Sequence, residues 1–168
     1  MNAITPDRFF FRYRQWLTRT LVVGGLLTGI SVYGHAEGEV LTPQDMIEIR
    51  QQGFKKMGAA IKTCRDELRA SEPDQAKLLA AAQSLDALAD KIGDWFPTGT
   101  GPGTGIKTDA LPYIWKNPEK FTSISAQLPP ATQDLLAAVA ANDKSALATQ
   151  VKAVIDVCSA CHRSFRAD

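Results

Sequence analysis

The sequence from Asp143 to Arg166 reads DKSALATQVKAVIDVCSACHRSFR. Asp143 is a residue type that favours the N-cap of a helix. After it, apolar and cysteine side chains recur at intervals of three and four residues, which is the period of one helix face. These side chains are Leu147, Val151, Val154, Cys158, Cys161 and Phe165. The stretch therefore predicts a long helix that presents one face to a core.

Another long helix, the first one along the chain, is predicted from Thr42 to about Arg69. Thr42 offers a hydroxyl N-cap, Pro43 suits the first helical position, and Asp45 places an acid in the first turn. The inward face of this helix repeats with the same period. Its members are Ile47, Arg50, Phe54, Met57, Ile61, Cys64 and Leu68.

The second helix along the chain is predicted to start at Ser71-Glu72-Pro73 and to end at Pro97. Its inward face consists of Leu78, Ala81, Leu85, Leu88, Ile92 and Trp95. Residues 97–108 are rich in Gly, Thr and Pro, which predicts a loop. The glycines of this loop lack the spacing of a nucleotide-binding motif, so we expect a flexible connector.

The third helical segment along the chain contains Pro129-Pro130. Each proline removes a backbone donor and disfavours helix in the preceding residue, so we expect a break or a sharp kink there. The apolar register continues across the prolines, which indicates that both halves face the same core. The members of this face are Phe121, Ile124, Leu128, Ala131, Leu135 and Ala138.

The four inward faces together predict the fold class. Each repeats near 3.5 residues, and the connections after the first and third helical segments along the chain are short. This pattern is typical of an antiparallel, left-handed four-helix bundle. No segment shows the strict alternation of a half-buried strand. We therefore predict one all-α domain over residues 37–168.

Residues 1–36 differ from the rest of the chain. Four arginines precede an apolar run over residues 21–32, and the small residues Gly34 and Ala36 follow. This order is typical of a secretory signal peptide. The alternative is an uncleaved membrane anchor, but a spanning helix needs roughly 20 apolar residues. We expect cleavage after Ala36, which leaves no stable membrane anchor.

The predicted mature chain is nearly neutral. Residues 37–168 carry 15 Lys and Arg against 17 Asp and Glu, a net charge of about −2. This charge lacks the dense positive field that binds nucleic acid. His35 falls in the predicted leader, so His162 is the single histidine of residues 37–168.

Residues Cys158-Ser159-Ala160-Cys161-His162 form the C-x-x-C-H pattern of c-type haem attachment. On a helix, Cys158 and Cys161 project from one face, so both thiols can bond one edge of the porphyrin. His162 follows on the same side and can bind the iron. A redox disulfide is normally placed at the start of a helix, and zinc needs more ligands than these three residues supply. The motif therefore predicts one covalent haem c.

The sequence pattern leaves more than one candidate for the second axial ligand of the iron. A second histidine is not available in residues 37–168, so the remaining candidates are Met46, Met57 and the lysines. Met57 belongs to the inward face of the first helix. If it binds the iron, the protein is a low-spin, six-coordinate electron carrier; otherwise the iron is open to exogenous ligands.

Two further residues of the first helix need explanation. Arg50 interrupts an apolar face, and a buried guanidinium needs an anionic partner, which a haem carboxylate can supply. The alternative is a solvent-facing arginine at the edge of the bundle. Cys64 is the thiol left over after haem attachment, and its inward position favours a buried side chain over an intermolecular disulfide.

The mature chain resembles the cytochromes c′ over essentially its whole length. On the first helix, Arg50-Gln51-x-x-Phe54-x-x-Met57-Gly58 resembles a run of that family. Thr108 and the segment 112–115 resemble the part that follows the second helix. The C-x-x-C-H motif with Phe165-Arg166 behind it resembles the family's C-terminal pattern.

The resemblance implies roles for several residues. Phe54 takes the distal position, where low-spin relatives carry a methionine, so the implied iron is high-spin and five-coordinate. Arg50, Gln51 and Thr108 are implied at the haem. Arg166 resembles a proximal-side arginine, although a cation in the last turn also complements the helix dipole.

The resemblance also implies a function. We expect a periplasmic protein that binds nitric oxide, and carbon monoxide as a second gas, and that exchanges electrons with an unidentified redox partner. Phe54 has no hydrogen-bond donor to stabilise bound oxygen. A haem enzyme such as a peroxidase needs a distal acid–base group, so we do not expect an enzyme. A homodimer formed through the first two helices is also implied.

Overall fold

A computed structural model describes residues 41–167 of the chain, and the predicted leader lies outside these residues. Within this range the chain is helical, and its one β-type contact is an isolated bridge between Ala110 and Arg166. The elements in chain order are α1 (Pro43–Arg69), α2 (Gln75–Ala89), the 3-10 turn η1 (Gly93–Trp95), α3 (Tyr113–Lys116), α4 (Pro118–Ser125), α5 (Leu128–Ala140) and α6 (Lys144–Phe165).

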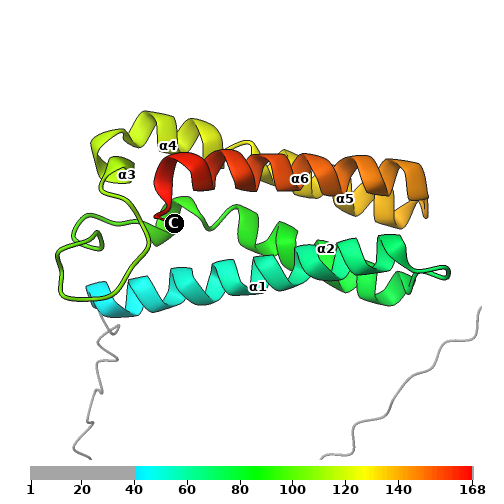
Figure 1. The fold of residues 1–168 in the computed structure, drawn as a ribbon, viewed down its shortest axis with the longest axis horizontal. Coiled ribbons are helices and arrows are strands. Elements are labelled where there is room, and N and C mark those ends of the chain that lie inside the picture. The colour runs from blue at the N-terminus through cyan, green and yellow to red at the C-terminus, as the bar shows by residue number, and fades with distance from the viewer. Residues whose placement is uncertain (1–40, 168) are drawn as a thin grey trace, which may run out of the picture. The chain divides into compact units, whose positions relative to one another are not determined.

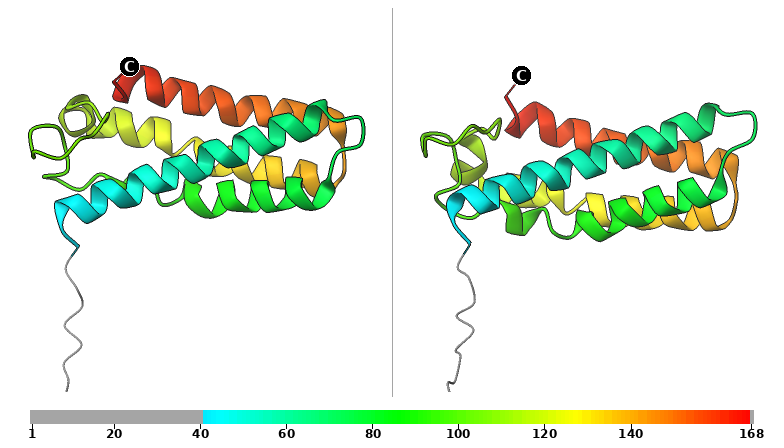
Figure 2. Two further views of the ribbon diagram at one scale, coloured as in Figure 1. Left: turned by 60° about the horizontal axis from the view of Figure 1, so that its bottom comes forward. Right: turned by 90° about the horizontal axis from the view of Figure 1, so that it is seen from below.

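The long helices α1, α2, α5 and α6 lie along one another (Figure 1). α1 packs against α2 and α6, and α5 packs against the same two helices. The turns between α1 and α2 and between α5 and α6 lie at one end, and α3 and α4 lie at the other (Figure 1, Figure 2). The predicted all-α, antiparallel four-helix bundle is confirmed.

The caps of the two longest helices also agree with the sequence. The Thr42 N–H donates to Asp45 Oδ2 at 2.8 Å, and the Asp45 N–H donates to Thr42 Oγ1 at 3.2 Å. This reciprocal pair is a capping box, and α1 ends at Arg69 as predicted. Asp143 Oδ1 accepts from the N–H groups of Ser145 and Ala146.

The boundaries of α2 differ from the prediction. The helix starts at Gln75, because Asp74, rather than Ser71, accepts from its first free N–H groups. It ends at Ala89, where the backbone tightens into bonds from Lys91 to Leu88 and from Ile92 to Ala89. Ile92 and Trp95 are nevertheless buried, each with 5% exposed surface. The inward face therefore continues beyond the helix that was expected to carry it.

The predicted break in the helical segment that contains Pro129 and Pro130 is confirmed, and it lies just before the two prolines. α4 ends at Ser125 and α5 begins at Leu128, so Pro129 and Pro130 occupy the first turn of α5. Proline is tolerated there because the first N–H groups of a helix have no partner within it. Phe121 in α4 and Leu135 in α5 are both buried, which confirms that the two helices share one core.

None of the helices between residues 41 and 167 has an apolar stretch long enough to span a bilayer. At the end that holds the α1–α2 and α5–α6 turns, Leu78 of α2 and Val139 of α5 are buried, each with 1% of its surface exposed. Toward the other end, residues of α1 and α6 line a cavity.

Candidate functional site

A cavity of about 490 Å³ lies between α1 and α6. Its size falls within the roughly 300–1,000 Å³ range of cofactor and ligand pockets. α4 and the segment that leads into α3 complete its wall. The cavity brings together every site residue predicted from the sequence. These are Arg50, Gln51, Phe54, Thr108, Cys158, Cys161, His162 and Arg166.

The C-x-x-C-H residues lie on the last turns of α6. Cys158 and Cys161 are partly buried free thiols. Burial raises the pKa of both, that of Cys161 to about 11, with the neighbouring Cys158 as the second cause. Reactive redox thiols need a lowered pKa, so these environments do not favour a dithiol redox site.

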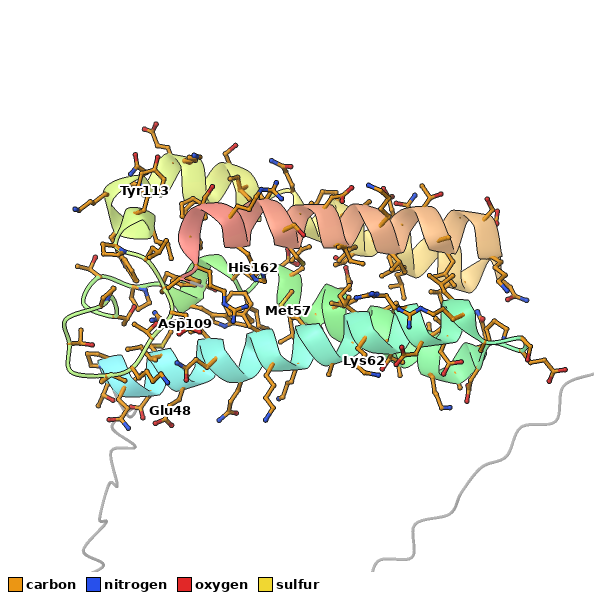
Figure 3. The ribbon with its side chains drawn as sticks, viewed as in Figure 1. Glu48, Met57, Lys62, Asp109, Tyr113 and His162 are labelled. Carbon is orange, nitrogen blue, oxygen red and sulfur yellow. The ribbon has the colours of Figure 1, made fainter. Side chains whose placement is uncertain are left out.

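His162 stands at the rim of the same cavity. Figure 3 shows its side chain in the space between α6 and α1, which also contains Met57. Partial loss of hydration lowers the pKa of His162, and the positive charge of Arg166 lowers it further. Both effects favour the neutral imidazole, which is the form that binds a metal.

Arg50 is buried, with 2% of its surface exposed, so the alternative of a solvent-facing arginine is wrong. Its Nη1 donates to Thr100 Oγ1 at 3.0 Å, and its Nη2 donates to the Thr100 carbonyl and to Thr108 Oγ1, each at 2.7 Å. All three acceptors are neutral. No carboxylate of residues 41–167 forms an ion pair with Arg50. Burial lowers the pKa of Arg50. Its positive charge lines the cavity and has no ion-pair partner among the described residues 41–167.

Two aromatic rings hold the guanidinium of Arg50. Its Cζ lies 4.9 Å from the centroid of Phe96 and 5.9 Å from that of Trp115. The Trp115 indole N–H is within hydrogen-bond distance of the Phe96 and Pro97 carbonyls, at 3.1 and 3.2 Å. These aromatic residues and Thr100 were not predicted as part of the site. No local motif identifies them, because they meet Arg50 only through contacts between distant segments.

Gln51 and Thr108 fix the loop that follows η1. Gln51 Nε2 donates to the Lys107 carbonyl at 3.1 Å. Thr108 Oγ1 accepts from Arg50 and also from the Ala110 N–H. The loop expected to be a flexible connector is thus tied to α1 at both ends.

Phe54 and Met57 both line the cavity from α1. Phe54 packs edge-on against Trp95, with centroids 5.2 Å apart and an interplanar angle of 86°. The centroids of the Phe54 and Phe96 rings are 6.1 Å apart. Met57 is buried, with 5% of its surface exposed. The fold therefore keeps both candidate distal residues at the site.

Arg166 lies just beyond the end of α6 and is largely exposed. Its Nη2 is 3.7 Å from Asp109 Oδ2, and Asp109 also lines the cavity. The backbone of the same segment is paired: the Leu111 N–H donates to the Phe165 carbonyl, and the Ala167 N–H donates to the Asp109 carbonyl. Asp109 was not predicted, because its partner lies 57 residues further along the chain.

The residues present fit a covalent haem. Two thiols and an imidazole stand on one helix end at an apolar cavity, which suits a porphyrin held by thioethers and an axial histidine. Arg50 offers an unbalanced positive charge to a carboxylate-bearing group. Cys64 is not among the residues that line the cavity, and its exposed surface is 0%, which confirms the expected buried thiol.

Comparisons with known proteins point to one family. The family model described as "Cytochrome C'" matches residues 45–166. The cytochrome c′ of Rhodopseudomonas palustris is 32% identical over 145 residues, which cover 84% of this chain and 93% of that protein. A solved cytochrome c′ described by its ligand-controlled dimer dissociation superposes with a TM-score of 0.72 at 28% identity, covering 77% of this chain and 99% of that one.

A second solved structure is a nitric oxide complex of a mutant cytochrome c′ from Alcaligenes xylosoxidans. It superposes with a TM-score of 0.68 at 25% identity and covers 77% of this chain and 100% of that one. The fold, the haem-attachment motif and the matched family model agree with one another. The chain therefore belongs to the cytochrome c′ family of c-type haem proteins.

Proposed function

We propose that this protein is an exported cytochrome c′ that binds nitric oxide, and carbon monoxide as a second gas, at an open haem site and also takes part in electron transfer. The observation that supports the proposal is the α1 wall of the cavity, which includes Phe54, a residue that cannot bind iron and to which we assign the distal position. That wall supports a gas-binding role, and Phe54 offers none of the acid–base chemistry that a haem enzyme needs.

Cys158 and Cys161 would hold the haem by two thioether bonds, and His162 would supply its axial imidazole. When bound, the haem would supply an iron that can bind a small gas and exchange an electron. Arg50 would take a haem carboxylate, because its charge has no anionic partner among residues 41–167. Thr100 and Thr108 hold the Arg50 guanidinium in place.

Phe54 would control what reaches the free axial position. Its ring packs edge-on against Trp95, so it forms part of the cavity wall. A phenyl ring excludes water and offers no hydrogen bond to bound oxygen. Nitric oxide and carbon monoxide do not require such a donor. The nitric oxide complex of the Alcaligenes xylosoxidans relative supports this choice of ligand.

A second candidate function follows from Met57. It is buried, lines the same cavity and lies one turn after Phe54 on α1. If its thioether closed the site, the protein would be a low-spin electron carrier with a raised potential.

Export, cleavage after Ala36 and a periplasmic location are also part of the proposal. They rest on the sequence of residues 1–36 and on the oxidising compartment in which a c-type haem is attached. A homodimer through α1 and α2 is supported by the dimer named for one solved relative, and Ile49 and Leu79 are each 39% exposed on these helices.

The test is the optical spectrum of the haem-loaded protein, ferric and ferrous, before and after addition of nitric oxide. An open site predicts a broad high-spin ferrous Soret band that changes when the gas is added. Met57→Leu serves as the matched variant: its spectrum stays that of the wild type if Met57 does not bind the iron. Sharp low-spin bands that are insensitive to the gas, and that Met57→Leu converts to high-spin bands, would replace the proposal with the Met57-ligated electron carrier.

A further inference from the structure

Tyr113 is the one exposed aromatic side chain of residues 41–167, with 39% of its surface accessible. It begins α3, and Lys120 Nζ lies 5.3 Å from the centroid of its ring. Lys116, at the end of α3, is exposed as well. Neither lysine pairs with a carboxylate in the part of the chain that the structure describes. We call Tyr113, Lys116 and Lys120 the Tyr113 face.

The Tyr113 face is connected to the cavity by one aromatic contact. The Tyr113 ring stacks on Phe165, with centroids 5.8 Å apart and an interplanar angle of 26°. Phe165 is buried, with 3% of its surface exposed, and lines the cavity three residues after His162. Phe121 meets Phe165 edge-on at 5.3 Å and lines the cavity too. A single buried ring thus separates the exposed tyrosine from the proposed haem site.

The charge of this face indicates the kind of partner. Within residues 112–120 there are two lysines and one acid, Glu119. Residues 37–168 as a whole carry a net charge of about −2, from 15 basic and 17 acidic side chains. The Tyr113 face is therefore positive on a chain of opposite overall sign. Local charge of this kind steers encounter with a partner of complementary charge.

Tyrosine is also a residue that protein interfaces favour, because its ring is apolar and its hydroxyl can remain hydrated. The ring of Tyr113 contacts both Phe165 and Lys120. Electron tunnelling falls steeply with distance, so a docking site next to the cavity wall is the useful one. The Tyr113 face combines an aromatic contact, a positive charge and a position next to the cavity wall.

We propose that the Tyr113 face is the docking surface for an acidic redox protein, with electrons passing to the haem through the contact between Tyr113 and Phe165. The inference rests on the electron-transfer part of the proposed function. In the reduction direction, the partner loses one electron and the iron changes from ferric to ferrous. No bond is made or broken, and no proton is transferred by Tyr113.

The test uses the haem-loaded protein and an acidic flavodoxin as the probe. The rate constant of haem reduction by flavodoxin hydroquinone is measured by stopped flow over a range of ionic strengths. Binding of oxidised flavodoxin is measured separately by calorimetry. Dithionite, a small reductant that needs no docking surface, reports whether the haem itself accepts electrons.

Three variants are compared with a matched control. The double variant Lys116→Glu/Lys120→Glu removes the positive charge, and Tyr113→Leu removes the ring while keeping an apolar contact for Phe165. Tyr113→Phe keeps the ring. Lys144→Glu is the control, because Lys144 is an exposed lysine at the other end of the bundle (Figure 1).

We expect the double variant to lower the flavodoxin rate constant about tenfold and to flatten its salt dependence. Flavodoxin affinity should fall with it. Tyr113→Leu should lower the rate constant several-fold, while Tyr113→Phe and Lys144→Glu stay within about twofold of the wild type. All variants should react with dithionite at the wild-type rate.

The proposal is overturned if the double variant and Tyr113→Leu keep the wild-type flavodoxin rate constant and affinity. It is also overturned if the wild type shows no salt-dependent binding of flavodoxin while dithionite reduces the haem normally. If dithionite fails to reduce the wild type, the electron-transfer part of the proposed function fails, and this inference fails with it.

Discussion

The guanidinium of Arg50 donates two hydrogen bonds to Thr100, one to its hydroxyl and one to its carbonyl, although 50 residues separate them. A third bond from the same guanidinium reaches Thr108. One side chain of α1 therefore fixes both ends of the glycine-rich segment between these threonines. Because its positive charge also faces the cavity, the order of this loop and the binding of an anionic group there depend on the same residue.

Replacing Arg50 by glutamine should loosen this loop. Hydrogen bonds to charged groups contribute about 1.5–3 kcal/mol each, and glutamine cannot reach all three acceptors. We expect the amide hydrogens of residues 100–108 to exchange faster and the free energy of unfolding to fall by about 2 kcal/mol. Hydrogen exchange followed by mass spectrometry gives the first quantity, and urea denaturation gives the second.

Arg69→Gln is the control for this prediction, since Arg69 is an exposed arginine at the end of the same helix. It should leave both quantities close to those of the wild type. Equal exchange of residues 100–108 in Arg50→Gln and the wild type would show that Arg50 does not order the loop.

Gly53 allows Trp95 to lie against the backbone of α1. A Cβ built at Gly53 would lie 2.3 Å from Trp95 Cη2, which is closer than atoms can approach. Gly53→Ala should therefore displace a buried ring and destabilise the fold by about 1–3 kcal/mol. Thermal denaturation measures the change. Gly93→Ala is the matched control, because a Cβ there meets no atom within 4 Å. A stable Gly53→Ala protein with unchanged tryptophan fluorescence would contradict the packing described.

Replacing Phe54 by methionine should close the site that we propose to be open to gases. Phe54 lines the cavity from α1, so under the proposed function a thioether at this position would be placed to bind the haem iron. We expect low-spin optical bands, a midpoint potential higher than that of the wild type, and at least tenfold weaker binding of nitric oxide. Phe54→Leu, which adds no ligand, should stay high-spin. A high-spin Phe54→Met protein would show that Phe54 does not occupy the distal position.

Cys64 should make stability depend on pH in the alkaline range. Burial raises the pKa of its thiol from 9.0 to about 11. Above pH 9 the unfolded chain loses this proton while the folded protein keeps it, so the free energy of unfolding decreases as pH rises toward 11. The slope approaches about 1.4 kcal/mol per pH unit.

Cys64→Val removes the titrating group while keeping an apolar side chain. Urea denaturation between pH 8 and 10.5 should show a shallower decline for this variant than for the wild type. Parallel declines would mean that the thiolate is tolerated in the folded protein.

Much of this structure could be predicted from local sequence. The capping box of Thr42 and Asp45 defines the start of α1 because both partners lie within one turn. The C-x-x-C-H motif predicts its chemistry for the same reason, since a helix places these side chains together without help from the rest of the fold. The errors occurred where local signals competed, as at Asp74, which caps α2 in place of Ser71.

The sequence by itself determined the helical faces, the caps at Thr42 and Asp143, the break next to Pro129 and the position of the C-x-x-C-H motif, because each depends on groups within a few positions of one another. Only the tertiary structure decided the partners of Arg50, the contact of Trp95 with Gly53, and the pairing of Asp109 with Arg166. These contacts join segments that are distant in sequence. Their geometry is set by how the helices pack and where the loops close, and no periodicity in the chain encodes it.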